Sequence, residues 1–385
     1  MGKTTTALRY ARAALRLDRE AERGLVLDDP DAAIREGPFP LLIDEWQHAP
    51  DVLLAVKRSV DAALSPPGRY IITGSARNDL HLGQWPLTGR VLNTQLWPLT
   101  GRERFGDATS PSLFDRWDTD SRFKLPTDAP DVLGYLDIAL DGGFPGALEA
   151  SAAGARDDWM RTYVDAAVSR DLGEFSSGNG RRRSPESLRR CLTAHALHTS
   201  GVVPETAMAR AAGVDRRTLL GYHEMLTVLR LADDAPAWHS NRLKRLTSMP
   251  KRYLTDSGLA AWLMGADRES LKRDSDARGR IIDTYVAAQL RAEIDVSAGR
   301  ARMFHMRTQG GEREIDLIVE FGRRLAAFEI KTSSAPGPRD ARHIAWLRDR
   351  LPPDRFAGGV VFHTGPHRYR LGDSIEAVPI AGLWG

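Results

Sequence analysis

Short apolar runs alternate with amphipathic stretches over the first hundred residues. Residues 39–45 (FPLLIDE) and 68–75 (GRYIITGS) are too short and too apolar for surface helices, so each predicts a buried strand. Residues 24–28 (GLVLD) predict a further strand. Residues 7–11 and 51–64 place apolar side chains at helical spacing. This alternation of strands and helices predicts an α/β domain with a parallel sheet.

The pattern changes after residue 110. Residues 111–130 are rich in Asp, Ser, Thr and Pro without periodicity, so we expect a linker. Helical spacing follows, and residues 204–219 have the helix, glycine turn and second helix of a helix-turn-helix unit. Residues 278–290 predict an amphipathic helix. The strands predicted after it are 304–307, 314–319, 325–331 and 360–362.

Composition narrows the class of protein without identifying it. A chain of 385 residues argues for two or three domains, and 42% hydrophobic with 27% charged residues indicates a globular protein. The net charge of +3 does not by itself indicate nucleic-acid binding. The single cysteine, Cys191, excludes an internal disulfide and fits a reducing compartment. No apolar run approaches the roughly 20 residues of a membrane span, so we expect a cytoplasmic protein without a membrane partner.

The first residues carry part of a phosphate-binding motif. Gly2, Lys3 and Thr4, followed by Thr5, match the last positions of G-x-x-x-x-G-K-[ST]. In that loop the backbone N–H groups cradle phosphates, the lysine neutralises their charge and the hydroxyl holds Mg²⁺. Taken alone, the short match also fits a basic N-cap on a surface helix.

Two carboxylates follow the strand at residues 39–45. Asp44 and Glu45 stand at its carboxyl end, where ligands bind in parallel sheets. Asp44 would hold Mg²⁺ through water, and Glu45 would polarise the attacking water in phosphoryl transfer. The alternative is an ordinary acidic turn. Ser75, after the next strand, is placed to contact the γ-phosphate or water, and Arg90 to reach nucleotide in a neighbouring subunit. Such a role for Arg90 would imply a homo-oligomer, and a plain surface arginine is the alternative.

A second group of charged residues lies near the C-terminus. Asp316 and the pair Glu329 and Lys331 fall on adjacent predicted strands, and the period-two spacing of the pair directs both side chains to one face. Two acids can bind Mg²⁺ while a lysine positions or activates water, which is the arrangement of metal-assisted phosphodiester hydrolysis. The alternative is an inactive, half-buried ion-pair cluster.

The helix-turn-helix segment suggests contact with DNA. Its second helix carries Arg216 and Arg217 at the N-terminal end, and Arg181, Arg182 and Arg183 lie in a loop upstream. Winged-helix units also serve as packing modules, so a solvated basic patch is the alternative. His195 and His198 have no third ligand nearby in the sequence, and we do not expect them to bind metal.

These motifs together resemble a prokaryotic family of AAA-type ATPases that carries a C-terminal domain of unknown function, family 4143. The resemblance rests on residues 27–30 (LDDP), 43–50 (IDEWQHAP), 72–75 (ITGS), 89–90 (GR), 97–99 (WPL), 142–145 (GGFP) and 253–259 (YLTDSGL). It implies ATP as ligand and Mg²⁺ as cofactor. The C-terminal region is similar to PD-(D/E)xK nucleases, in which Asp283 would stand at the place of a helical carboxylate.

The resemblance implies four regions. They are a P-loop AAA-type domain at 1–110, a linker and helical segment at 111–185, a winged-helix-like region at 186–250 and an α/β restriction-endonuclease-like domain at 251–385. The motif lacks its first glycine and the strand before it. We therefore expect that the start codon was assigned inside the motif, and that ATP binds only weakly to the chain as written.

Three functions remain open at this point. The first is an ATP-binding AAA-type ATPase that couples nucleotide binding and hydrolysis to a nuclease-like domain. The second is a metal-dependent DNA nuclease with a regulatory or inactive ATPase domain. The third is a noncatalytic protein that binds DNA or a protein partner.

Overall fold

The computed structural model describes residues 2–62, 67–74, 87–150, 152, 154–175, 184–308 and 310–385. Internal contacts divide the chain into two compact units, Met1–Leu96 and Trp97–Gly385. Each unit has a hydrophobic core of its own.

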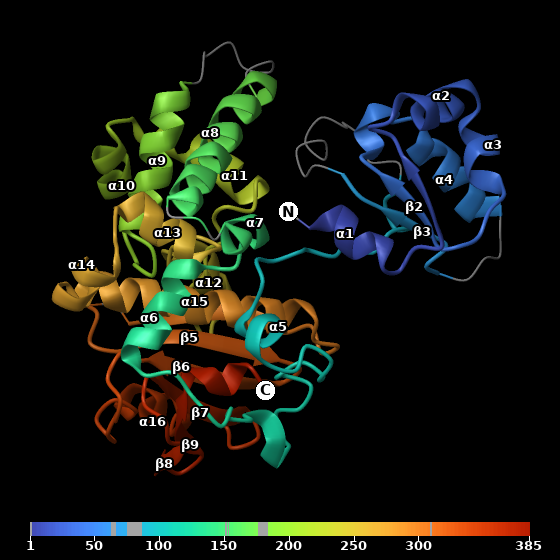
Figure 1. Cartoon of the computed structure of the whole chain (residues 1–385). Coiled ribbons are helices and arrows are strands. Elements are labelled where there is room, and N and C mark those ends of the chain that lie inside the picture. The colour runs from blue at the N-terminus through green and yellow to red at the C-terminus, as the bar shows by residue number, and fades with distance from the viewer. Residues whose placement is uncertain are drawn as a thin grey trace. The chain divides into compact units, whose positions relative to one another are not determined.

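The first unit is a parallel sheet with helices packed on it (Figure 1). The strands are β1 (Ala13–Arg16), β2 (Leu41–Asp44) and β3 (Tyr70–Ile72), in the order β1-β2-β3. The helices are α1 (Lys3–Leu8), α2 (Glu20–Asp28), α3 (Pro30–Arg35) and α4 (Val52–Ala62). All four residues of β2 are buried, as expected for the middle strand of a covered parallel sheet.

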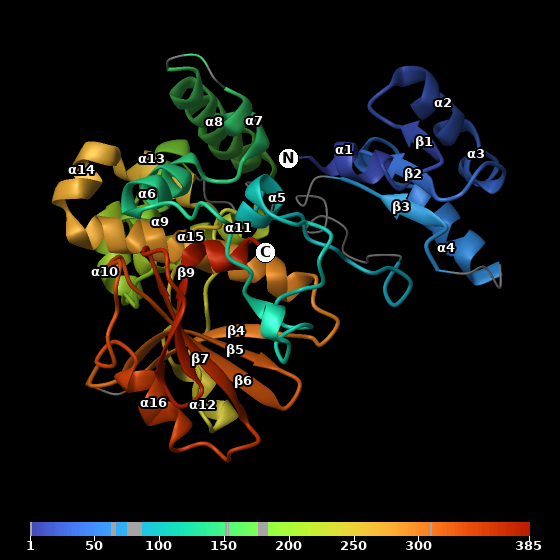
Figure 2. The ribbon, with the colours of Figure 1, turned by 60° about the horizontal axis from the view of Figure 1, so that its bottom comes forward.

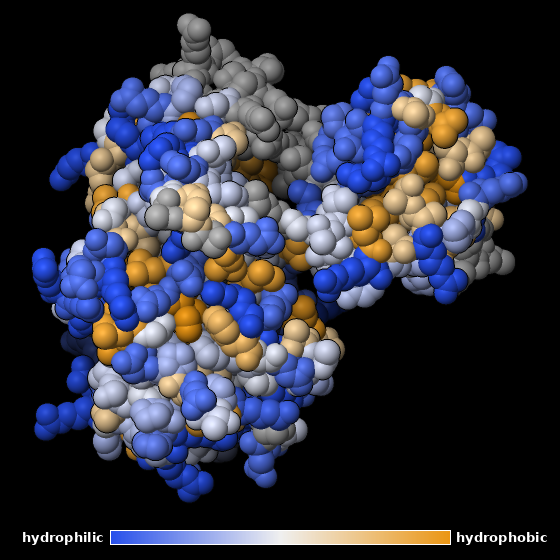
Figure 3. Space-filling model, in the orientation of Figure 1, coloured by the Kyte–Doolittle hydropathy of each residue, from blue (hydrophilic) through white to orange (hydrophobic). Residues whose placement is uncertain are grey.

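Three of the elements predicted for this unit are confirmed, whereas the helix expected at 7–11 begins earlier, at Lys3, and ends at Leu8. Strands β2 and β3 and helix α4 lie within the predicted ranges. The strand predicted at 24–28 is wrong, because these residues belong to α2. Leu25 and Leu27 are 62% and 60% exposed, and of the three apolar residues only Val26 is buried. Apolar and polar residues also mix on the face of this unit that Figure 3 shows.

The sequence pattern does not predict strand β1. Its four residues, Ala13–Arg16, are only half-buried and give a weak hydrophobic signal. It ends just before α2, whose residue Glu22 accepts a hydrogen bond from the backbone N–H of Arg16 at 2.5 Å.

The second unit contains a mixed sheet of six strands in the order β4-β5-β6-β7-β9-β8. The strands are β4 (Arg302–Arg307), β5 (Glu314–Phe321), β6 (Arg324–Ile330), β7 (Phe356–His363), β8 (Tyr369–Gly372) and β9 (Ile375–Pro379). β4, β5 and β6 are antiparallel neighbours, whereas β7 runs parallel to both β6 and β9. The strands predicted at 304–307, 314–319, 325–331 and 360–362 are confirmed, the third apart from its last residue, which follows β6.

Helices make up most of the rest of this unit. They are α5 (Gly101–Phe105), α6 (Val132–Asp141), α7 (Pro145–Glu149), α8 (Ala155–Phe175), α9 (Pro185–Leu197), α10 (Glu205–Ala212), α11 (Arg216–Val228), α12 (Arg242–Thr247), α13 (Ser257–Met264), α14 (Arg268–Arg273), α15 (Ser275–Asp295) and α16 (Arg342–Arg348). None of the helices in the described part of the chain is long and apolar enough to span a membrane.

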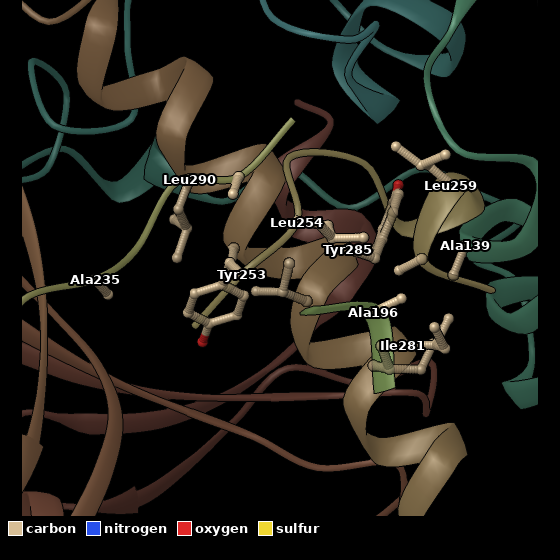
Figure 4. Packing of buried hydrophobic residues seen from close by; sticks show 14 of the residues in the cluster. Ala139, Ala196, Ala235, Tyr253, Leu254, Leu259, Ile281, Tyr285 and Leu290 are labelled. Atoms are coloured by element: carbon tan, nitrogen blue, oxygen red, sulfur yellow. The ribbon is translucent and has the colours of Figure 1, made fainter. Parts of the chain in front are cut away.

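The long helix α15 is the centre of the second unit. It contacts β4 and β6, whereas α16 contacts β5, β6 and β7 (Figures 1 and 2). Figure 4 shows Ile281, Tyr285 and Leu290 of α15 beside Tyr253 and Leu254. All five are buried, so α15 packs on the segment around residue 253 as well as on the sheet.

The expected linker at 111–130 has little regular structure but is not a free connection. Phe114, Trp117 and Phe123 are buried, and the Trp117 ring packs 5.6 Å from the ring of Phe321 on β5. The indole N–H of Trp117 donates to the carbonyl of Ala357 at 3.0 Å. The segment therefore lacks regular structure, as expected, and aromatic burial fixes it to the sheet domain.

The predicted helix-turn-helix spacing is confirmed. Helices α10 and α11 are joined through Gly213, which has φ 63°, a left-handed conformation that glycine adopts without steric cost. The Asp215 side chain caps α11 by accepting from the N–H of Thr218 at 2.9 Å.

Candidate functional site

Asp44, the last residue of β2, lies where side chains from three other parts of the first unit converge. Its Oδ1 accepts a hydrogen bond from Thr4 Oγ1 of α1 at 2.9 Å and another from Oγ1 of Thr73, which follows β3. Nε of Arg16, at the end of β1, lies 4.0 Å from Oδ2. The carboxyl ends of all three strands thus meet at one carboxylate, the edge where ligands bind in parallel sheets.

The groups around Asp44 suit a magnesium ion. The carboxylate and the hydroxyls of Thr4 and Thr73 are hard oxygen donors, which Mg²⁺ prefers. Within the described ranges, no side chain donates a hydrogen bond to Oδ2 of Asp44, although the residue is only 1% exposed. Mg²⁺ is commonly held by one or two protein oxygens together with substrate phosphates, and the donor set fits that use.

Glu45 is held next to Asp44 in a backbone conformation that is rare for residues with a side chain. Its φ of 54° and ψ of 48° are left-handed. Nε2 of Gln47 donates a hydrogen bond to Glu45 Oε2. A Cβ atom at Gly74 would lie 2.6 Å from Cδ1 of Trp46, so the end of β3 needs a glycine against this turn. Strained backbone of this kind concentrates at functional sites.

The other predicted residues of this site are distributed differently. Gly2 has φ 82°, which favours glycine. Lys3 and Thr5 are exposed, and their side chains make no hydrogen bond to any described residue. Ser75 lies outside the described residues.

Arg90 is not brought to Asp44. It pairs with Asp61 near the end of α4, with Nη2 to Oδ2 at 3.0 Å. Because α4 connects two parallel strands, it runs back across the sheet and ends at the edge opposite Asp44. Within one chain Arg90 is therefore remote from the carboxylate, and its role toward a neighbouring subunit stays a prediction.

Sequence reasoning missed Arg16 and Gln47 as members of this site. Arg16 was missed because β1 was missed. The available signal for Arg16 is its position as a polar residue at the end of the short run Ala13–Arg16, which lies between two helices. Gln47 belongs to the motif at residues 43–50, but its contact with Glu45 depends on the left-handed turn, which the sequence does not predict.

The second unit brings Asp316, Glu329 and Lys331 together as predicted. β5 and β6 are antiparallel neighbours, with Leu317 opposite Phe328. Nζ of Lys331 donates to Glu329 Oε2 at 2.9 Å, which confirms that these two side chains share a face. The N–H of Ile330 donates to Asp316 Oδ2 at 3.0 Å.

Lys251 is a further member of this cluster that the sequence did not reveal. Its Nζ donates to Asp283 Oδ2 at 2.6 Å and to Asp316 Oδ1 at 2.9 Å. The Tyr253 hydroxyl donates to the other oxygen of Asp283 at 2.8 Å. The only signal in the sequence was a lysine and a tyrosine two residues apart, which places both on one side of an extended chain. We call Lys251, Tyr253, Asp283, Asp316, Glu329 and Lys331 the Lys251 centre.

Burial and neighbouring charges shift the pKa values in the Lys251 centre. Burial would lower the pKa of Lys251, but Asp283 and Asp316 hold it well above its usual value. Burial raises the pKa of Asp283 to about 6. Burial and the Asp316 charge raise the pKa of Glu329 well above its usual value. Lys251 is therefore charged at neutral pH, and burial favours the protonated form of Glu329.

No group of three or more His, Cys, Asp or Glu side chains in the described ranges is arranged to hold a metal ion. The expected metal ligands Asp316 and Glu329 lie on adjacent strands, but the ammonium of Lys251 is hydrogen-bonded to Asp316.

The arginines predicted to contact DNA differ in their pairing and exposure. Nη2 of Arg216 pairs with Glu205 of α10 at 2.6 Å, which reduces its charge toward an outside phosphate. Arg217 is exposed, and Arg181, Arg182 and Arg183 lie outside the described residues. Binding of DNA stays a prediction.

Family comparisons divide the chain into three matched stretches. Residues 1–105 match the model of an AAA domain, residues 134–270 match domain of unknown function 8612, and residues 278–383 match domain of unknown function 4143. These matches support an AAA-type ATPase with a domain of family 4143. The AAA domain holds Thr4, Asp44, Glu45 and Thr73. The 4143 domain holds the three carboxylates of the Lys251 centre, whereas Lys251 lies in the 8612 stretch.

The chain is also similar to individual proteins. The chain is 28% identical over 382 residues to uncharacterized proteins of Mycobacterium tuberculosis and Mycobacterium bovis, covering 98% of this chain and 77% of each relative. It is also 38% identical over 88 residues to a UPF0102 protein of Solibacter usitatus, which covers 22% of this chain and 64% of that protein. No solved structure matches the chain.

Proposed function

We propose that the AAA domain binds ATP with Mg²⁺ and hydrolyses it at the site around Asp44. The observation that carries the proposal is the 2.9 Å hydrogen bond between Thr4 and Asp44, which are 40 residues apart in the sequence. A motif threonine and a strand-end carboxylate in contact are the two protein groups that hold Mg²⁺ in P-loop hydrolases. When bound, Mg²⁺ would neutralise charge on the phosphate oxygens of ATP.

Each neighbouring residue has a role in this proposal. The exposed ammonium of Lys3 is free to meet phosphate oxygens. The Glu45 carboxylate accepts a proton from the attacking water, and Gln47 orients it through the hydrogen bond to Oε2. Thr73 fixes Asp44 from the neighbouring strand.

Glu45→Gln tests the hydrolytic step. Loss of the base should lower phosphate release from ATP by a factor of about 10²–10⁴. Binding of a fluorescent ATP analogue should persist, because Asp44 and Thr4 are intact. Glu36→Gln, the same change on an exposed residue of this domain, should leave both unchanged. Wild-type turnover in Glu45→Gln would overturn the role of Glu45.

Asp44→Asn tests the magnesium site separately. The variant keeps the shape of the side chain but loses its charge, so addition of Mg²⁺ should no longer strengthen binding of the ATP analogue. Asp28→Asn, on the exposed end of α2, is the matched control. An unchanged response to Mg²⁺ in Asp44→Asn would contradict the site.

Cleavage of nucleic acid by the 4143 domain is a weaker candidate. The contact of Lys331 with Glu329 beside Asp316 favours it, because acids and a lysine on adjacent strands are the groups that such chemistry uses. The ammonium of Lys251 between Asp283 and Asp316 weighs against it.

A further inference from the structure

The Lys251 centre joins a cation from one stretch of the chain to carboxylates from another. Lys251 belongs to residues 134–270, and Asp283, Asp316 and Glu329 belong to residues 278–383. We infer that Lys251 is the built-in cation of the 4143 domain, and that it takes the position which a divalent metal would need between Asp283 and Asp316.

The carboxylate oxygens already have partners within the protein. On Asp283, one oxygen accepts from Lys251 at 2.6 Å and the other from Tyr253 at 2.8 Å. On Asp316, one oxygen accepts from Lys251 at 2.9 Å and the other from the N–H of Ile330 at 3.0 Å. A metal that used these oxygens would have to displace at least one of these bonds.

Charge leads to the same conclusion. A divalent ion bound to Asp283 and Asp316 would lie within a few ångströms of the Lys251 ammonium, in a buried place where repulsion is weakly screened. A second ammonium, that of Lys331, forms an ion pair with Glu329 at 2.9 Å. The donor set therefore does not fit the Mg²⁺ that resemblance to nucleases implies.

Lys251 cannot easily leave the centre. Its backbone N–H and C=O both pair with Ala235 at 2.9 Å. The carbonyl of Met249 contacts Nε2 of His305 at 3.0 Å, and the N–H of Arg252 donates to Gly201 at 2.8 Å. The side chain of Lys251 is 2% exposed, so its ammonium is buried.

The neighbouring residue extends this connection to the helix-turn-helix unit. Arg252, on the other side of the segment, contacts Asp234, Glu205 of α10 and His223 of α11. Residues 251–253 thus tie α10 and α11 to α15 and β5. We assign this segment as a charged connector between the helical region and the sheet.

Binding of Mn²⁺, followed by electron paramagnetic resonance without nucleotide, tests the inference. The experiment uses the Asp44→Asn chain, so that metal at the ATPase site does not interfere. A matched second chain carries Asp44→Asn with Glu329→Gln, which leaves the bonds of Lys251 untouched. Both chains should bind the same amount of Mn²⁺. One ion per chain that depends on Glu329 would overturn the inference.

Lys251→Met, added to Asp44→Asn, gives the converse test. If this chain is folded by circular dichroism, it should gain a Mn²⁺ site, because Asp283 and Asp316 lose their internal cation. A folded variant without that site would overturn the assignment of Lys251 as the group that excludes metal. If the variant does not fold, the comparison of the two preceding chains decides.

Discussion

Asp44 and Asp316 are both acids of a sheet beside polar side chains from other elements, yet their surroundings differ in one respect. Asp44 is held by two hydroxyls, and among the described residues the cationic atom paired with it is Nε of Arg16 at 4.0 Å. Asp316 is held by an ammonium at 2.9 Å, with a second carboxylate on the same ammonium. Neutral donors leave the charge of Asp44 available to an incoming cation, whereas Lys251 cancels the charge of Asp316 from within. The motif residues alone do not distinguish these cases.

The largest expected effect comes from removing the internal cation. Lys251→Met leaves buried Asp283 and half-buried Asp316 without the ammonium that pairs with both, which should lower the free energy of unfolding by about 3–5 kcal/mol. Urea unfolding followed by circular dichroism measures it.

Lys272→Met is the control for that change. Lys272 forms an exposed pair with Glu269, and loss of such a pair costs at most about 1 kcal/mol. If both lysine variants unfold at the same urea concentration, the charge pairing of Lys251 is not what stabilises the sheet domain.

A smaller effect is expected at the Asp44 site, where close packing replaces charge pairing. Gly74→Ala would place a methyl group 2.6 Å from Trp46 Cδ1 and 3.0 Å from Gln47 Oε1. Such overpacking should cost about 1–3 kcal/mol and should lower ATP turnover by displacing Gln47 from Glu45.

Gly24→Ala should change the stability of the same domain in the opposite direction. Gly24 lies inside α2, and nothing lies within 4 Å of an added Cβ. Alanine should therefore stabilise the helix by about 0.5–1 kcal/mol and leave turnover unchanged. Stabilisation by Gly74→Ala would refute the packing argument.

An effect that depends on pH is expected at His195, on the Arg252 side of the connector. His195 is buried, stacks on His223 at 4.9 Å between ring centres, and neither of its ring nitrogens has a hydrogen-bond partner among the described residues. Burial, with the nearby charges of His223 and Arg252, lowers the pKa of His195 to about 3, despite the opposing charge of Asp234.

This lowered pKa predicts a loss of stability in acid. Below pH 6.5 the unfolded chain binds a proton that folded His195 does not bind, so stability falls as pH falls from 6.5 toward 3. The slope is at most about 1.4 kcal/mol per pH unit. His195→Leu should reduce the change in the urea midpoint of unfolding between pH 6.5 and pH 5. His367→Leu, at an exposed site, should not reduce it. An unchanged slope in His195→Leu would contradict the assignment.

Sequence patterns predict the elements correctly where the residues that look apolar in the sequence are also buried in the structure. The run at 39–45 predicted β2 and the place of Asp44 and Glu45, and the glycine turn in residues 204–219 predicted the turn between α10 and α11. The run at 24–28 failed because two of its three apolar residues face solvent in a helix. Local hydrophobicity cannot tell a strand from such a helix when the run is short.

The residues that meet in the two sites are harder to predict from the sequence than the fold. Adjacent strands predicted that Asp316, Glu329 and Lys331 meet, since pairing of β5 and β6 follows from a hairpin. Lys251 comes from 65 residues earlier than Asp316, and nothing local to it indicates that contact. Long-range partners of this kind depend on tertiary packing, which one sequence does not encode in any short pattern.

The alternation of side chains along residues 251–253 has a consequence for how this protein can vary through evolution. Lys251 and Tyr253 face the carboxylates, and Arg252 faces the helices. Substitution of one residue changes the contacts on one side of the segment, but insertion or deletion of one residue just before Lys251 would exchange the two sides and remove all of them. Homologous chains should therefore conserve the length of this segment more strictly than the identity of its residues.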